Sequence, residues 1–366
     1  MNEITLQTKL IHNDSKWDKA TGALSVAIQP ASTFHQFDLE NFGNYDYARS
    51  GNPTREALEN LIAQLEAGYR GFAFSSGMAA ISTTLLMFNA GDHLIITEDV
   101  YGGTHRVVTK ILTRFNIEHT FVDLTDTEKI KDAIKPNTRA IYIETPSNPT
   151  LKETDIKKVC QIAKNHNLLT IVDNTFLTPI YQRPLKLGAD IVLHSATKFL
   201  AGHSDVVAGL VVVNDEEIAS KIYFLQNALG AVLGPNDSWL VIRGMKTLHV
   251  RMEKASKSAK KIASFLNIHP LVKKVYYPKK GAVLSFELND YEAVKTFHRK
   301  IKLPAFAVSL GGVESILSYP AKMSHAAMSE KERLNRGITN GLIRLSVGLE
   351  NVDDLISDLN FGLSNL

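Results

Sequence analysis

Short apolar runs alternate with amphipathic stretches through roughly the first two thirds of the chain. The runs are typical of strands buried on both faces, and they lie at 71–74, 93–96, 140–143, 168–172 and 191–193, with a further strand expected at 206–213. Helical spacing of apolar residues predicts helices over 53–67, 78–88, 104–115, 126–134 and 154–166. Continuous apolar strands joined by helices indicate a mainly parallel sheet with helices on its faces.

The pattern changes near residue 235. A long helical periodicity covers 237–266, and shorter strands and a closing helix follow at 273–276, 283–287, 343–347 and 350–360. The first 50 residues lack long periodicity and are rich in Asn, Asp, Gln and aromatic residues. We therefore predict an N-terminal arm over 1–50, a large α/β domain over 51–235 and a smaller α+β domain over 236–366. The arm is expected to lie on another surface rather than fold alone.

Composition narrows the class of protein. Of 366 residues, 44% are hydrophobic and 22% charged, which is ordinary for a globular chain and disfavours disorder. Lys and Arg number 41 against 38 Asp and Glu, and this small balance disfavours a nucleic-acid or membrane-surface binder. No run of 18 apolar residues occurs and the first ten residues do not resemble a signal peptide, so we expect a soluble cytoplasmic protein.

Cysteine and histidine usage bears on redox and metal chemistry. The single cysteine, Cys160, excludes an intrachain disulfide and a cysteine-based zinc cluster. It falls in a predicted helix, where we expect it to be half-buried. The twelve histidines form no His-x-x-x-His pattern and no acidic cluster matches a metal loop, so no metal site is predicted.

The most informative polar residues are Asp173 and Lys198. Each follows an apolar strand, and they are 25 residues apart, so one crossover would place both at the carboxyl edge of a parallel sheet. A lysine in a partly desolvated pocket can form a Schiff base, and a nearby aspartate can hold a proton on a pyridine nitrogen. Together they suit pyridoxal phosphate. The alternative is a strand-end carboxylate and an ordinary surface lysine.

Three groups of residues could hold a phosphate. Ser75-Ser-Gly-Met78 follows a strand and opens a helix, whose first backbone N–H groups can face an anion. Hydroxyls precede the lysine, and a phenol and a guanidinium occur in the arm. The candidate phosphate ligands are therefore Gly77, Met78, Ser195, Thr197, Tyr47 and Arg49.

Two further residues could serve the ring and the substrate. Tyr101 lies on a glycine-rich turn, where its ring could stack on a flat cofactor and its hydroxyl could transfer a proton. It could equally pack on the core. Arg344 lies within an apolar, strand-like run. A buried arginine needs an anionic partner, and a substrate carboxylate would serve.

The ordered motifs of the chain resemble those of the cystathionine gamma-synthase family, the Cys/Met-metabolism enzymes that use pyridoxal phosphate. The resemblance covers nearly the whole chain. It is carried by Tyr47-Ala-Arg-Ser-Gly-Asn-Pro-Thr-Arg55, Ser75-Ser-Gly-Met-Ala-Ala80, Tyr101-Gly-Gly-Thr104, Glu144-Thr-Pro-Ser-Asn-Pro149, Val172-Asp-Asn-Thr175, His194-Ser-Ala-Thr-Lys198, Ser309-Leu-Gly-Gly-Val-Glu-Ser315 and Arg344-Leu-Ser-Val-Gly348. It implies a fold-type I, aspartate-aminotransferase-like PLP-dependent transferase that forms a homotetramer of closely joined dimers.

The resemblance also implies residue roles. Lys198 would form the Schiff base with pyridoxal 5'-phosphate, Asp173 would pair with the pyridine nitrogen and Tyr101 would stack on the ring. Gly77, Met78, Ser195 and Thr197 would hold the phosphate, with Tyr47 and Arg49 reaching it from the neighbouring subunit. Asn148, Ser309 and Arg344 would bind the substrate's α-carboxylate.

The reaction expected first is γ-replacement, in which L-cysteine displaces the acyl group of an O-acyl-L-homoserine and forms L-cystathionine for methionine biosynthesis. Only Lys279-Lys280 separate Tyr277-Pro278 from Gly281, where family members often carry a longer stretch, so the chain resembles a short bacterial form of the synthase. Cystathionine gamma-lyase and O-acetylhomoserine sulfhydrylase are the alternatives within the family. Outside it, Ser195-Ala-Thr-Lys198 fits the S-x-x-K motif of serine acyl-enzymes, with Lys246-Thr as the nearest candidate for the accompanying strand. A non-catalytic pyridoxal-phosphate carrier would leave Tyr101 and Arg344 unexplained.

Overall fold

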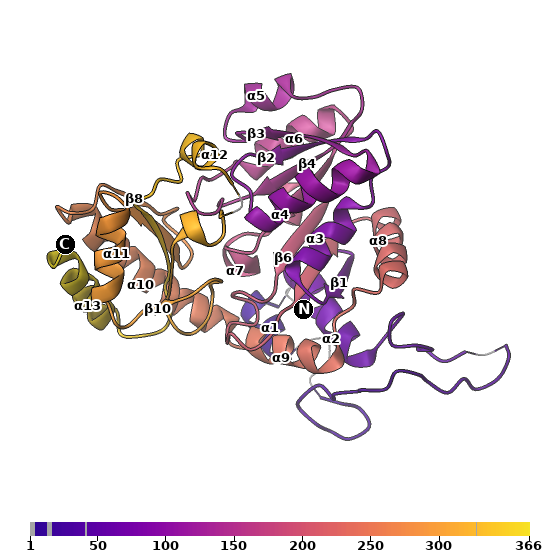
Figure 1. Cartoon of the computed structure of the whole chain (residues 1–366). Helices are drawn as coiled ribbons and strands as arrows, with labels where there is room; N and C mark the ends of the chain where they lie inside the picture. The colour runs from indigo at the N-terminus through magenta and orange to yellow at the C-terminus, as the bar shows by residue number, and fades with distance from the viewer. Residues whose placement is uncertain (1–3, 13–16, 41, 327) are drawn as a thin grey trace.

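A computed structural model describes residues 4–12, 17–40, 42–326 and 328–366. Within them, a seven-stranded sheet has the order β1-β7-β6-β5-β4-β2-β3 and lies between layers of helices (Figure 1). Its strands are β1 (Arg70–Phe74), β2 (His93–Thr97), β3 (Glu118–Val122), β4 (Thr138–Glu144), β5 (Leu169–Asp173), β6 (Ile191–Ser195) and β7 (Gly209–Val213). The pairs from β3 to β6 are parallel, which confirms the mainly parallel sheet expected from the apolar runs.

The helices of this part are α2 (Pro53–Glu66), α3 (Gly77–Leu85), α4 (Gly102–Arg106), α5 (Thr127–Asp132), α6 (Ile156–Asn165), α7 (Thr178–Tyr181) and α8 (Glu216–Leu229). Helix α2 begins as its sequence predicts: the Asn52 side chain accepts hydrogen bonds from two backbone N–H groups of the first turn, and Pro53 occupies the first helical position. After its end, Gly68 lies so close to β7 that an added Cβ would be 2.4 Å from Val212.

Four details of this sheet and its helices differ from the sequence prediction. Strand β7 is antiparallel to both of its neighbours and begins at Gly209 rather than 206. Strand β3 was not predicted, because this edge strand is partly exposed and its sequence, Glu-His-Thr-Phe-Val, lacks an apolar run. Helix α8 was also missed. The helix expected over 104–115 is instead α4, a π-helical turn (Val107–Ile111) and a 3₁₀ turn (Leu112–Phe115).

The long helix predicted over 237–266 is two helices, α9 (Pro235–Met245) and α10 (Leu248–Ile268). Arg251 explains the break, because its guanidinium donates to the carbonyl oxygens of Gly244 (2.8 Å) and Phe199 (2.7 Å). Its Nε donates to the hydroxyl of Thr247 at 3.0 Å. The first contact satisfies the Gly244 carbonyl near the end of α9, and the second joins this helix junction to a loop 52 residues away in the sequence.

A second, five-stranded sheet follows, with the order β10-β11-β12-β9-β8 and antiparallel pairing except between β10 and β11. Its strands are β8 (Lys274–Tyr276), β9 (Val283–Glu287), β10 (Ala305–Phe306), β11 (Ile316–Ser318) and β12 (Leu342–Ser346), and its helices are α11 (Tyr291–Lys300), α12 (Glu330–Asn335) and α13 (Val352–Ser364). The mixture of strands and helices agrees with the α+β character expected after residue 235.

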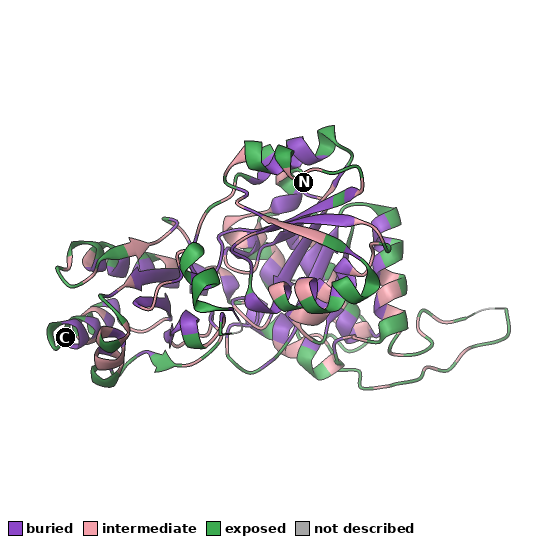
Figure 2. Cartoon of the chain, turned by 45° about the horizontal axis from the view of Figure 1, so that its top comes forward, coloured by how far each residue is buried: buried purple, intermediate pink, exposed green. Residues whose placement is uncertain are grey.

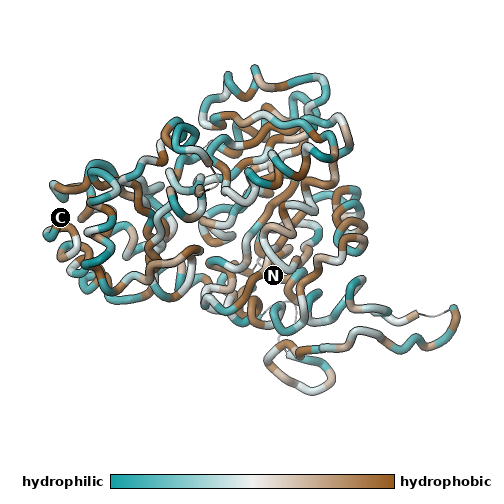
Figure 3. The backbone as a smooth tube through the Cα atoms, in the orientation of Figure 1, coloured by the Kyte–Doolittle hydropathy of each residue, from teal (hydrophilic) through white to brown (hydrophobic). Residues whose placement is uncertain are grey.

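The strands of both sheets form the cores. The buried residues of Figure 2 gather on the central strands, while exposed residues lie on the outer sides of the helices. The hydropathy of the backbone follows the same division, with hydrophobic stretches along the central strands (Figure 3). Cys160 faces this interior and is 7% exposed, so the expectation of a half-buried thiol was wrong.

The N-terminal segment differs from the rest of the chain. After α1 (Leu6–His12), its described residues up to 50 form neither a helix nor an extended strand, and part of the segment projects from the body (Figure 1). Large apolar side chains on it, such as Leu24, Phe37 and Leu39, are exposed. In the part of the chain that the structure describes, no helix combines the length and hydropathy needed to cross a membrane.

Candidate active site

The candidate site lies at the carboxyl ends of three neighbouring parallel strands. Strands β4, β5 and β6 end at Glu144, Asp173 and Ser195, and all three residues line a cavity of about 590 Å³. Glu144 and Asp173 are paired in the strand register. Asp173 and Lys198 therefore lie at the same edge of the sheet, as one crossover predicts, because β5 and β6 are adjacent and parallel.

Both sheets contribute to the cavity wall. Ten of the residues predicted from the sequence line it, namely Gly77, Met78, Tyr101, Asn148, Asp173, Ser195, Thr197, Lys198, Ser309 and Arg344. Arg344 comes from β12 of the second sheet, and Ser309 from the loop before β11. The cavity therefore joins side chains from the large α/β part and the C-terminal part.

Asp173 is buried at the floor of the cavity. Its Oδ1 accepts hydrogen bonds from the Thr175 hydroxyl (2.5 Å) and backbone N–H (3.0 Å), and Oδ2 accepts one from the Tyr142 hydroxyl at 3.5 Å. The Thr175 hydroxyl also accepts a hydrogen bond from the N–H of Ser195, which ties β5 to β6. Burial raises the pKa of Asp173, although the hydrogen bonds from Thr175 oppose the shift. A cationic group in the cavity would relieve the cost of this buried carboxylate.

Lys198 follows β6 and extends into the cavity. Its Nζ donates a hydrogen bond to Ser309 Oγ at 2.5 Å. Burial, assisted by the positive charge of Arg344, lowers the pKa of Lys198 to about 8. The neutral amine, which is the nucleophilic form, is thus far more accessible than in an exposed lysine.

The start of α3 forms a second wall. Ser76 caps the helix by accepting the N–H of Ala79 at 3.0 Å, and the helix begins at Gly77. A Cβ at Gly77 would lie 2.9 Å from Ser195 Cβ, so only glycine lets the helix start come this close to β6. Beside it, Thr197 exchanges hydrogen bonds with the backbone of Ala208. Hydroxyls and helix N–H groups therefore meet at one end of the cavity.

Arg344 supplies a buried cation. It is 4% exposed, and its Nη1 and Nη2 donate to Asn148 Oδ1 (2.9 Å) and Ser309 O (2.6 Å). Its Nε is buried and has no hydrogen-bond partner among the described residues. A buried guanidinium with an unused donor is suited to an incoming carboxylate.

Two predicted phosphate ligands, Tyr47 and Arg49, are not among the residues that line this cavity. Arg49 lies in the N-terminal segment and donates to Asn227 O (2.6 Å) and Oδ1 (3.1 Å) of α8. Tyr47 is about half exposed. Within one chain, the structure does not bring them to the other candidates.

Some residues of the cavity wall were not predicted from the sequence, notably Glu144, Arg106, Met323 and Ser324. Glu144 could have been found, because it ends an apolar strand just as Asp173 does. Its Oε2 accepts the N–H of Tyr101 at 2.8 Å, and burial beside Asp173 raises its pKa well above the ordinary value. Ser324 carries no comparable signal, since it comes from an irregular segment before α12.

The S-x-x-K alternative fails on this geometry. It needed a strand near Lys246-Thr247, and these residues lie between two helices. The amine of Lys198, the lysine of this motif, donates its hydrogen bond to Ser309 and not to the motif's Ser195.

The donor set fits pyridoxal phosphate. Lys198 would hold its aldehyde carbon, Asp173 its ring nitrogen, and the α3 start with Ser195 and Thr197 its phosphate. When bound, this cofactor accepts the electron pair released as a bond at the α-carbon of an amino acid breaks.

Comparison with known proteins supports pyridoxal phosphate as the cofactor. The model of the family described as "Cys/Met metabolism PLP-dependent enzyme" matches residues 7–364. The chain is 61% identical to cystathionine beta-lyase MetC of Bacillus subtilis over 99% of this chain and 97% of that protein.

Two solved structures are similar to this chain over nearly its whole length. Cystathionine gamma-lyase from Lactobacillus plantarum complexed with L-serine has a TM-score of 0.95 and 46% identity, covering 99% of both chains. Cystathionine gamma synthase from Xanthomonas oryzae pv. oryzae in complex with cystathionine has a TM-score of 0.96 and 40% identity, covering 99% of this chain and 98% of that one. These neighbours confirm the predicted fold class. The chain belongs to the Cys/Met metabolism PLP-dependent enzymes, and pyridoxal phosphate is its cofactor.

Proposed function

We propose that the protein cleaves L-cystathionine by β-elimination. The Cβ–S bond breaks, L-homocysteine leaves, and addition of water to the remaining three-carbon unit gives pyruvate and ammonia. The observation that carries this proposal is the 61% identity to a cystathionine beta-lyase over nearly the full length of both chains. This reaction was not among those expected from the sequence.

The cavity supports the shared steps of such chemistry. Arg344, with Asn148 and Ser309 beside it, would bind the α-carboxylate of the substrate. Lys198 has a pKa lowered to about 8 and would remove the Cα proton as a general base. Arg106 lines the cavity as a second guanidinium, which suits the distal carboxylate of a substrate such as cystathionine.

The second candidate is the γ-replacement expected from the sequence motifs, in which L-cysteine displaces the acyl group of an O-acyl-L-homoserine. It is favoured by the TM-score of 0.96 to a gamma synthase in complex with cystathionine. Both candidates require Lys198 at the α-carbon, so the shared residues do not separate them.

Product analysis with the holoenzyme separates the candidates. With L-cystathionine, β-elimination yields pyruvate and homocysteine, whereas γ-elimination yields 2-oxobutyrate and cysteine. O-acetyl- and O-succinyl-homoserine, each with and without cysteine, test for cystathionine formation. Pyruvate as the main keto acid supports the first proposal. Efficient cystathionine synthesis without cystathionine cleavage would establish the second and refute the first.

For the cellular localisation and the quaternary structure, the proposal follows the expectation from the family resemblance. We propose a cytoplasmic homotetramer in which Tyr47 and Arg49 complete the phosphate site of a neighbouring subunit. The projecting segment and the exposure of its apolar side chains, Leu24, Phe37 and Leu39, support a role in subunit contact.

A further inference from the structure

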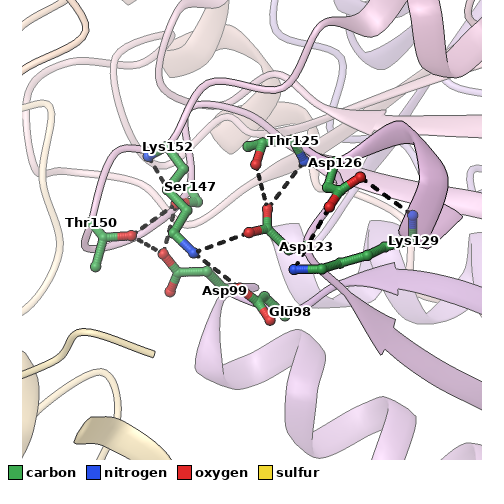
Figure 4. Close-up of polar contacts among 9 residues, drawn as sticks. All are labelled: Glu98, Asp99, Asp123, Thr125, Asp126, Lys129, Ser147, Thr150 and Lys152. Atoms are coloured by element: carbon green, nitrogen blue, oxygen red, sulfur yellow. Dashed lines mark hydrogen bonds and ion pairs between the residues drawn. The ribbon is translucent and has the colours of Figure 1, made fainter. Parts of the chain in front are cut away.

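A cluster of polar side chains joins the end of β2 to the loop 145–152, next to the cavity (Figure 4). At its exposed side, Lys152 Nζ contacts Glu98 at 2.9 Å and Asp123 at 3.9 Å. At its buried side stands Asp99, which is 2% exposed. None of these residues carries a role in the proposed reaction.

Asp99 forms hydrogen bonds with the loop 145–152 through one carboxylate oxygen. Its Oδ2 accepts hydrogen bonds from the hydroxyls of Ser147, at 2.7 Å, and Thr150. Its Oδ1 is buried and has no hydrogen-bond partner among the residues that the structure describes. Burial raises the pKa of Asp99 against the opposing effect of these hydroxyls. Burying a carboxyl group costs free energy of folding. Both side-chain hydrogen bonds that the structure gives Asp99 come from residues of the loop 145–152.

Hydrogen bonds within the loop 145–152 hold it in a compact turn. The N–H of Ser147 donates to Lys152 O at 3.0 Å, and the N–H of Lys152 donates to Ser147 Oγ at 3.1 Å. The N–H of Leu151 donates to Ser147 O at 3.0 Å. Movement of Ser147 therefore moves the whole turn.

This turn presents Asn148 to Arg344. Asn148 lies between Ser147, held by Asp99, and Pro149, whose carbonyl accepts the Ser285 hydroxyl at 2.7 Å. Ser285 on β9 is the register partner of Arg344 on β12. Asn148 Oδ1 then accepts Arg344 Nη1 at 2.9 Å. The loop is thus anchored on the large part by Asp99 and on the second sheet by Ser285.

We propose that Asp99 is a positioning residue for the substrate α-carboxylate site, acting by holding Asn148 against Arg344. The inference rests on the proposed function in one respect, that the ligand of Arg344 is an amino-acid carboxylate. It does not depend on which bond of that amino acid is broken.

The test measures ligand binding rather than turnover. Calorimetric titration of the holoenzyme compares L-serine with L-serine methyl ester, which lacks the carboxylate. We expect the wild type to prefer L-serine, and Asp99→Ala should lower this preference about tenfold, because a hydrogen bond to a charged group is displaced. Cofactor absorbance should remain near wild type. Because L-serine binding needs no cystathionine cleavage, failure of the proposed reaction leaves this test valid.

Replacing Asp99 by Asn tests whether the hydrogen bonds to the loop, and not the charge of Asp99, maintain L-serine affinity. Both hydroxyls donate to one oxygen of Asp99, so the carboxamide oxygen of Asp99→Asn can accept both. We expect this variant to retain L-serine affinity within about threefold. If Asp99→Ala does not fold, Ser147→Ala tests the same contact from the loop side and should lower the preference in the same direction.

The matched control is Asp126→Ala. Asp126 appears in the same cluster but accepts only N–H groups of its own helix α5 and contacts Lys129 (Figure 4). Its loss should lower Tm without changing L-serine affinity.

Three results would overturn the proposal. One is an unchanged preference in cofactor-loaded Asp99→Ala. Another is an equal effect of Asp99→Ala in the wild-type and Asn148→Ala backgrounds, since a residue acting through Asn148 must couple to it. The third is a wild type that does not distinguish L-serine from its ester.

Discussion

Replacing Asp173 by Asn tests the carboxylate at the floor of the cavity. The substitution preserves size, and the amide oxygen can still accept both hydrogen bonds from Thr175. The fold and the link from Thr175 to Ser195 should therefore survive. What is lost is the negative charge that would hold a proton at the pyridine nitrogen of the cofactor.

The magnitude follows from burial. Asp173 is 9% exposed, so its charge acts with little screening by solvent. Removing one partner of a buried ion pair costs about 3–5 kcal/mol. A ring nitrogen without its partner sheds its proton, and an unprotonated ring is a weaker electron acceptor. Since about 1.36 kcal/mol corresponds to a tenfold change in rate, we expect kcat to fall by at least about 10²-fold.

The assay compares keto-acid formation by cofactor-loaded wild type and Asp173→Asn, with cofactor content measured by absorbance. Glu144→Gln is the matched control, because Glu144 is the strand partner of Asp173 and its raised pKa favours the neutral acid. A glutamine oxygen can still accept the N–H of Tyr101, so activity should stay within about threefold. Full activity in loaded Asp173→Asn, or equal losses in both variants, would refute the reasoning.

Three further predictions concern other residues. Lys198→Ala should abolish turnover, and the wild-type apoenzyme should take up pyridoxal phosphate faster as pH rises through about 8, because the neutral amine predominates above the lowered pKa of Lys198; a flat uptake profile would count against that assignment. Arg49→Ala should weaken cofactor binding, and mixed oligomers of Arg49→Ala and Lys198→Ala subunits should regain some activity, since one shared site would be intact; no recovery in mixed oligomers would argue against sharing. Cys160 is buried with its pKa raised to about 11, so iodoacetamide should modify it only after denaturation, as mass spectrometry would show; rapid labelling of the folded enzyme would contradict this burial.

Local patterns predicted much of the scaffold. Asn52-Pro53 and the spacing of leucines define the start and inward face of α2, because capping and apolar periodicity act over a few residues. The apolar runs of β4, β5 and β6 predicted buried parallel strands. Two polar residues at or shortly after the ends of such strands, Asp173 and Lys198, were therefore correctly expected at one edge of the sheet.

Where contacts span distant parts of the chain, the patterns failed. Strand β3 was missed because its formation depends on pairing with β2, not on its own polar sequence. The break between α9 and α10 depends on Arg251 reaching the Phe199 carbonyl. Neither partner can be identified from local periodicity.

The candidate site divides in the same way. The sequence by itself determined which residue types were available: the lysine, the aspartate, the glycine at a helix start and a buried arginine. Tertiary structure alone decided that Arg344 meets Asn148, 196 residues away in the chain, and that Lys198 reaches Ser309. It also decided that Asp99 holds the loop. The physical reason is that motifs record local backbone geometry, whereas these contacts arise only when the packing of two sheets brings distant segments together.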